Sequence, residues 1–349
     1  MRSRTRSAAA WRWRFRASLA IAVPAAAAGL LLGPAGPAHA AGPLLYVPDT
    51  NTDTVSVVDA STSAITATVP VGTAPEYTAV TPDGSQVFVS SMFSVSVISA
   101  SSDTVTATIP LDAYTTDLGQ DARQVVVDPA GAFAYVVTQA GYVVQISTAT
   151  DTVTGAVYLG NTSPRSLAIA PDGATLYVSG LSSSVSVVDT ASLTVRSVID
   201  TRELQSFAIA VTPDGGSVYV AYDHGINVRK SDVAVISTAT DQVTARVPIS
   251  PIQDSLEGIA AAPDGASIYV TVGDQDELAV ISTATNTVTA TVPGLAQPVA
   301  VALDSAGTTA WVSQLNAGDG SVAAIDTASD TITGTVPGFQ FPFGLSVAG

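Results

Sequence analysis

The sequence contains no cysteine, and only 12% of its residues are charged. Without thiols the chain can form no disulfide bond, hold no metal through thiolates and attach no haem covalently. The fold must therefore be stabilised by burial of apolar side chains, for which a hydrophobic content of 47% over 349 residues is sufficient. From Leu44 onward no segment has the 3.6-residue periodicity of an amphipathic helix, and Val, Thr, Ile and Ser dominate. We therefore expect an all-β protein.

Histidine is also scarce, and this limits the chemistry that the chain can perform. Of the two histidines, His39 lies in the N-terminal 40 residues, and His224 lies in the insertion at 221–232. The many serines have no histidine placed beside them, and the motif G-x-S-x-G is absent. The acidic groups Asp274, Asp276 and Glu277 lack the glycine and distal glutamate of an EF-hand loop, so we interpret them as solvated turns. The sequence predicts no catalytic constellation, no metal site and no cofactor.

The first 40 residues differ in kind from the rest. Residues 1–16 contain six arginines and no acid, an apolar run follows at 17–32, and Ala38-His39-Ala40 ends the segment. This order predicts a secretory signal peptide over residues 1–40 with cleavage after Ala40. The alternative is a membrane anchor, but about 16 apolar residues interrupted by Pro24 fall short of the roughly 20 that span a bilayer. We expect a secreted protein, extracellular or at the cell surface, with no integral membrane segment after cleavage.

Basic residues are rare in the remaining chain. Residues 41–349 contain all 29 acidic residues but seven of the 13 basic ones, which gives a formal net charge of −22. A field of this sign repels polyanions, so a nucleic-acid partner is disfavoured. We interpret the acidity as a source of solubility outside the cell.

The stretch 164–200 shows how the rest of the chain is built. It contains four short β segments, LAIA, TLYVS, VSVVD and TVRSVI, and Pro171-Asp172-Gly173 joins the first two. In such a turn proline fixes φ, and glycine takes the positive φ that other residues avoid. Four strands joined by three short connections predict an antiparallel meander. One meander cannot bury both of its faces, so it requires copies of itself on either side.

The copies can be counted from an aromatic-valine pair in the second strand. The aromatic residues of these pairs are Tyr46, Phe88, Tyr135, Tyr177, Tyr219, Tyr269 and Trp311. Seven units of about 42 residues fill 41–349 and leave nothing for a second domain. The chain enters in a second strand and ends with FGLSVAG, which matches a first strand. We therefore predict a seven-bladed β-propeller of four-stranded antiparallel blades, closed by pairing the C-terminal strand with the three N-terminal strands.

The repeated pattern PDG-x-x-x-YV-(S/T), followed by V-x-V-(I/V)-(D/S)-T-A-(T/S)-x-T-V, resembles the YVTN family of seven-bladed propellers. Good instances lie at 82–110, 171–198 and 263–293, and the resemblance covers essentially all of 44–349. The turns at 129–131 and 304–307 depart from the pattern but keep its glycine. The resemblance implies the fold and leaves the function open, because such propellers include surface-layer and other secreted proteins, sugar lactonases and redox-enzyme subunits.

The seven copies differ mainly on one face of the expected propeller. The turns between the first two and the last two strands hardly vary, and consecutive turns of a meander alternate between faces. The irregular connections, at 111–122, 221–232, 250–256 and 313–321, therefore share the opposite face. Binding residues concentrate on variable loops that a rigid scaffold positions, so we place the site on this face.

One position of the innermost strand is unusually rich in charge. By analogy with propeller geometry, the position after the usual proline lies at the mouth of the central channel. It holds Glu76, Arg123, Arg165, Phe207, Glu257, Val299 and Phe343. Arg202 lies in a connection that enters the same layer. The predicted ligand-binding residues are Glu76, Arg123, Arg165, Arg202, Phe207, Glu257 and Phe343.

The residue types at this position favour an anionic or carboxylate-bearing small ligand. The planar guanidinium forks of Arg123 and Arg165 suit such a group, and Phe207 and Phe343 supply apolar contact. We expect a monomeric binding or scaffold module for a small ligand or a cell-envelope partner, without chemistry of its own. Ion pairs that only solvate the mouth are one alternative. A lactonase-like hydrolase, in which Glu76 or Glu257 with a raised pKa activates water, is another. The third, single-stranded nucleic-acid binding, conflicts with the net charge.

Overall fold

The structure is a computed structural model that describes residues 42–115, 122–160, 163–202, 205–223, 231–250, 254–316 and 318–349. The proposed signal peptide and His224 lie outside these residues, as do parts of the four irregular connections. Within the described ranges no helix is long and apolar enough to cross a membrane.

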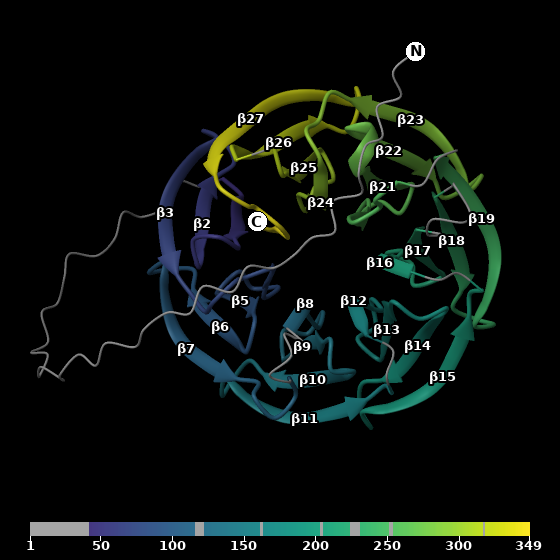
Figure 1. Cartoon of the computed structure of the whole chain (residues 1–349), viewed down its shortest axis with the longest axis horizontal. Coiled ribbons are helices and arrows are strands. Elements are labelled where there is room, and N and C mark those ends of the chain that lie inside the picture. The colour runs from purple at the N-terminus through teal and green to yellow at the C-terminus, as the bar shows by residue number, and fades with distance from the viewer. Residues whose placement is uncertain are drawn as a thin grey trace, which may run out of the picture. The chain divides into compact units, whose positions relative to one another are not determined.

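The described residues form seven four-stranded antiparallel sheets arranged in a ring (Figure 1). We number these blades from the N-terminus. Blade 1 contains β1 (Leu44–Asp49), β2 (Thr54–Asp59), β3 (Ala64–Pro70) and β28 (Ser346–Ala348). Blade 2 contains β4 (Tyr77–Val80), β5 (Gln86–Ser91), β6 (Ser94–Ser99) and β7 (Thr104–Pro110). Blade 3 contains β8 (Ala122–Val127), β9 (Phe133–Thr138), β10 (Tyr142–Ser147) and β11 (Thr152–Tyr158).

The other four blades repeat this order. Blade 4 contains β12 (Pro164–Ile169), β13 (Thr175–Gly180), β14 (Ser184–Asp189) and β15 (Thr194–Asp200). Blade 5 contains β16 (Gln205–Val211), β17 (Ser217–Asp223), β18 (Ser231–Ser237) and β19 (Gln242–Ser250). Blade 6 contains β20 (Ile259–Ala261), β21 (Ser267–Val272), the 3-10 turn η1 (Gly273–Gln275), β22 (Glu277–Ser282) and β23 (Thr287–Pro293). Blade 7 contains β24 (Pro298–Leu303), β25 (Thr309–Gln314), β26 (Gly320–Asp326) and β27 (Thr331–Phe339).

Both ends of the chain contribute to blade 1, as the split repeat predicts. The last strand, β28, pairs antiparallel with β1, so that Leu44 lies opposite Ala348 and Tyr46 opposite Ser346. The buried carboxylate of Asp49 accepts hydrogen bonds from the backbone N–H groups of Gln340 (2.7 Å) and Phe341 (3.0 Å). The ring therefore closes by strand pairing, and the predicted fold class is confirmed.

The turn between the first two strands adopts the predicted conformation. Gly173 has φ +73°, and Gly131, in one of the turns that depart from Pro-Asp-Gly, has φ +71°. Retention of the glycine therefore preserves this turn even where its other residues change.

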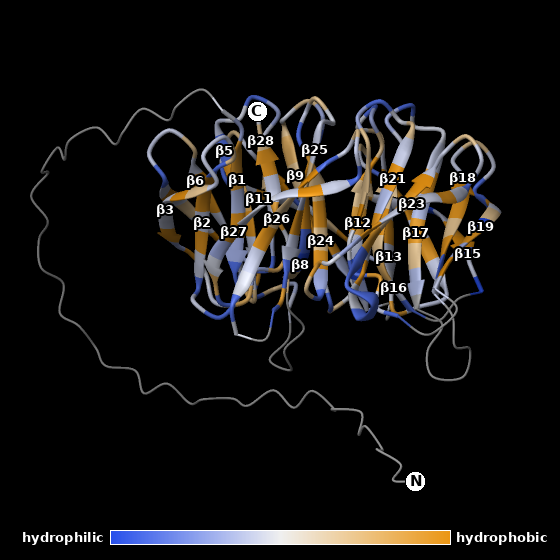
Figure 2. Cartoon of the chain, turned by 90° about the horizontal axis from the view of Figure 1, so that it is seen from above, coloured by the Kyte–Doolittle hydropathy of each residue, from blue (hydrophilic) through white to orange (hydrophobic). Residues whose placement is uncertain are grey.

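The apolar core lies between neighbouring blades. In the middle two strands of a blade nearly every residue is buried, because both faces of the sheet pack against another blade. One cluster, for example, joins Tyr219 and Val235 of blade 5 to Val270 and Ile281 of blade 6. Figure 2 shows the resulting distribution, with hydrophobic residues along the strands and hydrophilic residues at the turns.

Each outermost strand carries a β-bulge at the same place, where its pairing with the third strand shifts register. In six blades a threonine hydroxyl donates to a third-strand carbonyl beside the bulge, at 3.1–3.4 Å. These threonines are Thr66, Thr106, Thr154, Thr244, Thr289 and Thr333. Blade 4 has Arg196 at this position. A bulge increases the twist of an exposed edge strand, which hinders pairing with another chain.

Candidate functional site

The innermost strands of four blades break their pairing at the variable face, and three of these breaks contain a predicted residue. In β12 the register shifts between Pro164 and Ser166, which leaves Arg165 as the extra residue. Phe207 is skipped in the same way in β16, and Arg123 lies inside the shift in β8. A bulge bends its strand and redirects the side chain of the extra residue. In these four blades the mouth position identified in the sequence therefore coincides with an irregularity that sequence reasoning missed.

The predicted residues come together around one small cavity at the mouth of the channel. The cavity is lined by Glu76, Tyr77, Arg123, Arg165, Phe207, Glu257 and Phe343. Six of these seven were selected from the sequence, and they come from six different blades. Its volume of about 30 Å³ admits a group of a few non-hydrogen atoms rather than a whole cofactor.

Val299, which shares the mouth position, and Arg202, the remaining predicted ligand-binding residue, do not line the cavity. Val299 is buried, with 3% of its surface exposed. Arg202 is exposed at φ +58°, and its backbone N–H donates to the Asp200 carboxylate at 2.9 Å. The structure therefore separates Arg202 from the other predicted residues.

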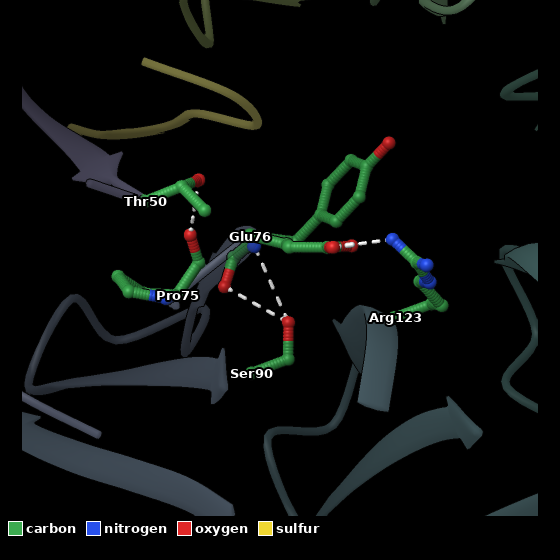
Figure 3. A network of polar contacts seen from close by, with 6 residues as sticks. Thr50, Pro75, Glu76, Ser90 and Arg123 are labelled. Atoms are coloured by element: carbon green, nitrogen blue, oxygen red, sulfur yellow. Dashed lines mark hydrogen bonds and ion pairs between the residues drawn. The ribbon is translucent and has the colours of Figure 1, made fainter. Parts of the chain in front are cut away.

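Glu76 and Arg123 form an ion pair between blades 2 and 3 (Figure 3). The side chains are 8% and 14% exposed, so the pair is largely shielded from water. The backbone of Glu76 is fixed on both sides, since its N–H donates to Ser90 O at 3.0 Å and its carbonyl accepts from Gly344 N at 2.7 Å. The charge of Arg123 is therefore neutralised by the Glu76 carboxylate of the neighbouring blade.

Arg165, in blade 4, has a different environment. Its guanidinium carbon lies 5.0 Å from the centroid of the Phe207 ring, in a cation-π contact. The Nε atom is buried without a hydrogen-bond partner, and among the described residues no carboxylate forms an ion pair with this side chain. Burial, followed by the nearby charge of Arg123, lowers the pKa of Arg165 from its ordinary value. Arginine remains protonated nonetheless, so the cavity contains a cation with an unsatisfied donor.

Glu257 provides a carboxylate two blades away from Arg165. It is half-buried just before β20, and its Oε1 accepts a hydrogen bond from Ser255 Oγ at 2.7 Å. Among the described residues no cation forms an ion pair with it. The four charged residues of the mouth have a formal net charge of zero, but only Glu76 and Arg123 are paired within the described structure.

Tyr77 also lines the cavity and was not predicted. Its ring packs edge-to-face on Phe343, with centroids 5.5 Å apart and an interplanar angle of 84°. Burial, followed by the charges of Glu76 and Glu257, raises the pKa of Tyr77 well above its ordinary value, while the two arginines oppose this shift. The hydroxyl therefore stays neutral and can donate or accept a hydrogen bond.

The close approach of blade 1 to Tyr77 depends on one glycine. A Cβ atom at Gly344 would overlap Tyr77 Cδ1 and would press on the carbonyl of Glu76. Any larger residue at this position would displace the tyrosine ring or the Glu76 backbone. This glycine was the signal in the sequence that could have identified the tight packing around Tyr77.

A second cavity, of about 70 Å³, continues into the channel and shares Tyr77 and Glu257 with the first. The Oε1 atom of Gln124, in its wall, accepts hydrogen bonds from Ser166 Oγ (2.5 Å) and Leu167 N (3.1 Å). The mouth therefore leads to a partly polar chamber with room for a few water molecules.

The acidic turns outside the mouth bind backbone amides. Asp276 Oδ1 accepts from Gln297 N at 2.8 Å, and Asp53 Oδ1 accepts from Ala74 N at 2.8 Å. In each case the aspartate lies in the connection between the second and third strands of a blade. The amide lies in the connection that leads from that blade to the next, so the bond joins the two connections. In the described ranges no three His, Cys, Asp or Glu side chains gather as metal ligands.

Comparison with known proteins supports the architecture. No family model and no curated protein matches the chain. Among solved structures it is similar to Kuenenia stuttgartiensis hydrazine synthase, with a TM-score of 0.72 and 24% sequence identity over 82% of this chain and 93% of that chain. The similarity is one of fold. At this identity it gives no information about the chemistry of the mouth.

Proposed function

We propose that the protein is a binding module that takes a small anionic ligand at the channel mouth. The environment of Arg165 carries this proposal. Its guanidinium borders the cavity, its Nε is buried without a hydrogen-bond partner, and no described carboxylate forms an ion pair with it. A buried donor without an acceptor costs about 1–3 kcal/mol, and an anionic ligand would remove this penalty.

The contacts assign different roles to the two arginines. Arg123 is already paired with Glu76, so we infer that it positions blades 2 and 3 and contributes little binding energy. Arg165 can offer its planar fork to a carboxylate, with Phe207 supporting one face of the guanidinium. Each charge-assisted hydrogen bond contributes about 1.5–3 kcal/mol.

The proposal extends to the origin and form of the protein. The repeat pattern supports membership of the YVTN-type propellers, and the arginine-rich, apolar N-terminus supports a signal peptide over 1–40 before a propeller at 41–349. We infer a secreted, monomeric protein that binds a small ligand or a cell-envelope component. Its acidic surface suits a soluble extracellular protein.

The test uses a carboxylate of known structure as the probe. We expect 3-phenylpropanoate, titrated calorimetrically, to bind the wild-type protein, and Arg165→Ala to weaken binding at least tenfold, which corresponds to about 1.4 kcal/mol. Arg202→Ala is the matched control, because it removes the same charge from an exposed position outside the cavity. Wild-type affinity in a folded Arg165→Ala variant, or equal losses in both variants, would contradict the proposal.

A further inference from the structure

The mouth cavity contains unpaired charges of both signs. Arg165 belongs to blade 4 and Glu257 to blade 6, and both line the same cavity. Nevertheless, no ion pair joins them, and neither has an ionic partner among the described residues. Phe207, from blade 5, lies between them in ring order and contacts Arg165. The arrangement therefore offers a cation, an apolar surface and an anion in sequence.

A ligand with only a negative charge would satisfy one end of this arrangement and be repelled by the other. An anion bound at the mouth would cover Glu257 and shield its carboxylate further from water without supplying a counter-ion. This desolvation costs free energy and would weaken the binding of a simple anion. A ligand with a carboxylate and an ammonium group would neutralise both residues. It would also leave the net charge of the cavity unchanged.

We infer that the ligand is a small zwitterion of the α-amino-acid type, an inference that rests on the proposed function. Its carboxylate binds Arg165, its ammonium group binds Glu257, and its side chain packs against the mouth aromatics Phe207 and Phe343. Tyr77 lines the same cavity, and its neutral hydroxyl can hydrogen-bond to either group of the ligand. The small cavity takes the charged head of the ligand, and the side chain lies at its apolar rim.

Matched probes separate this inference from the proposal on which it rests. L-phenylalanine and 3-phenylpropanoate share a carboxylate and an aromatic ring and differ only in the α-ammonium group, whereas 2-phenylethylamine carries the ammonium group alone. We expect L-phenylalanine to bind wild type at least tenfold more tightly than 3-phenylpropanoate. Glu257→Gln should abolish this preference, because it removes the charge and keeps the shape of the side chain.

Asp274→Asn is the control for a general effect of the protein's net negative charge, since it removes one negative charge from an exposed position outside the cavity. It should leave the preference for L-phenylalanine over 3-phenylpropanoate intact. Equal, Arg165-dependent binding of L-phenylalanine and 3-phenylpropanoate would overturn the zwitterion and leave the anion site standing. Absence of binding by both carboxylates, or binding that Arg165→Ala does not weaken, would overturn both. Tighter, Glu257-dependent binding of 2-phenylethylamine than of L-phenylalanine would identify a cation site and also overturn both.

Discussion

The ion pair between Glu76 and Arg123 makes a quantitative prediction about stability. Replacing Arg123 by Met keeps most of the side-chain volume and removes the cation that forms an ion pair with the Glu76 carboxylate, which is 8% exposed. Breaking a buried pair in this way costs about 3–5 kcal/mol. Because the arginine is still 14% exposed, we expect the lower end, about 3 kcal/mol. That is a change of about two orders of magnitude in the unfolding equilibrium.

The assay can use a single internal probe. Trp311, in blade 7, is 4% exposed and is the one tryptophan of residues 41–349, so its fluorescence follows exposure of the core during urea unfolding. In the double variant Glu76→Leu with Arg123→Met neither charge of the pair is left, so we expect most of the stability to return. The control Arg202→Met, at an exposed position, should change stability by less than about 0.5 kcal/mol. A loss below about 1 kcal/mol in Arg123→Met, at an unchanged denaturant slope, would refute the reasoning.

Two further predictions concern the turns and bulges. Arg196→Thr should introduce into blade 4 the bulge hydrogen bond found in the other six blades. We expect the unfolding free energy, measured by urea titration, to rise by about 0.5–1.5 kcal/mol. A loss of stability would contradict this account. Hydrogen bonds from Thr81 and Ser85 lower the pKa of Asp83, so its contribution is present above about pH 4 and is lost as the pH falls through the folded pKa. Asp83→Asn should therefore lower the melting temperature at pH 7, and the difference should shrink as the pH falls through the folded pKa. A difference that is independent of pH would count against this role.

The fold was predictable because the sequence encodes each blade several times. Seven copies of one meander remove the ambiguity of any single strand, and the split repeat identifies how the ring closes. The charged position at the mouth followed from comparison of equivalent residues in the copies. The bulges that direct Arg165 and Phe207 were not predictable from strand alternation, because a bulge interrupts the period of two on which that reasoning depends.

The pairing at the mouth was harder to predict than its composition. Arg123 and Arg165 occupy equivalent positions in adjacent repeats, and the residues directly beside them are uncharged in both repeats, so they do not indicate which arginine forms an ion pair. Their electrostatic environments differ because the preceding blade differs. Blade 2 places Glu76 beside Arg123, whereas blade 3 places the cation Arg123 near Arg165. Tyr77 was missed because it follows the mouth position by one residue, and its packing depends on Gly344 at the other end of the chain.

The aromatic residue used to count the repeats also has a role between blades. The hydroxyl of Tyr219, in blade 5, donates to Asn286 Oδ1 in the last turn of blade 6 at 2.6 Å. In blade 1, burial and the nearby charge of Asp103 in blade 2 raise the pKa of Tyr46 to about 12. The sequence period located these residues, but their contacts with the following blade became visible only in three dimensions.

The split construction of blade 1 also affects the order of assembly. Every other blade is complete in a continuous stretch of chain, whereas the inner edge of β1 remains unpaired until β28 has been synthesised. During that interval residues 44–46 expose unpaired backbone groups that are complementary to residues 346–348 of any copy of the protein. The C-terminal strand of a neighbouring chain can therefore complete the blade by the same pairing. The longer this edge of β1 stays unpaired, the more a strand-exchanged assembly competes with closure of the monomer.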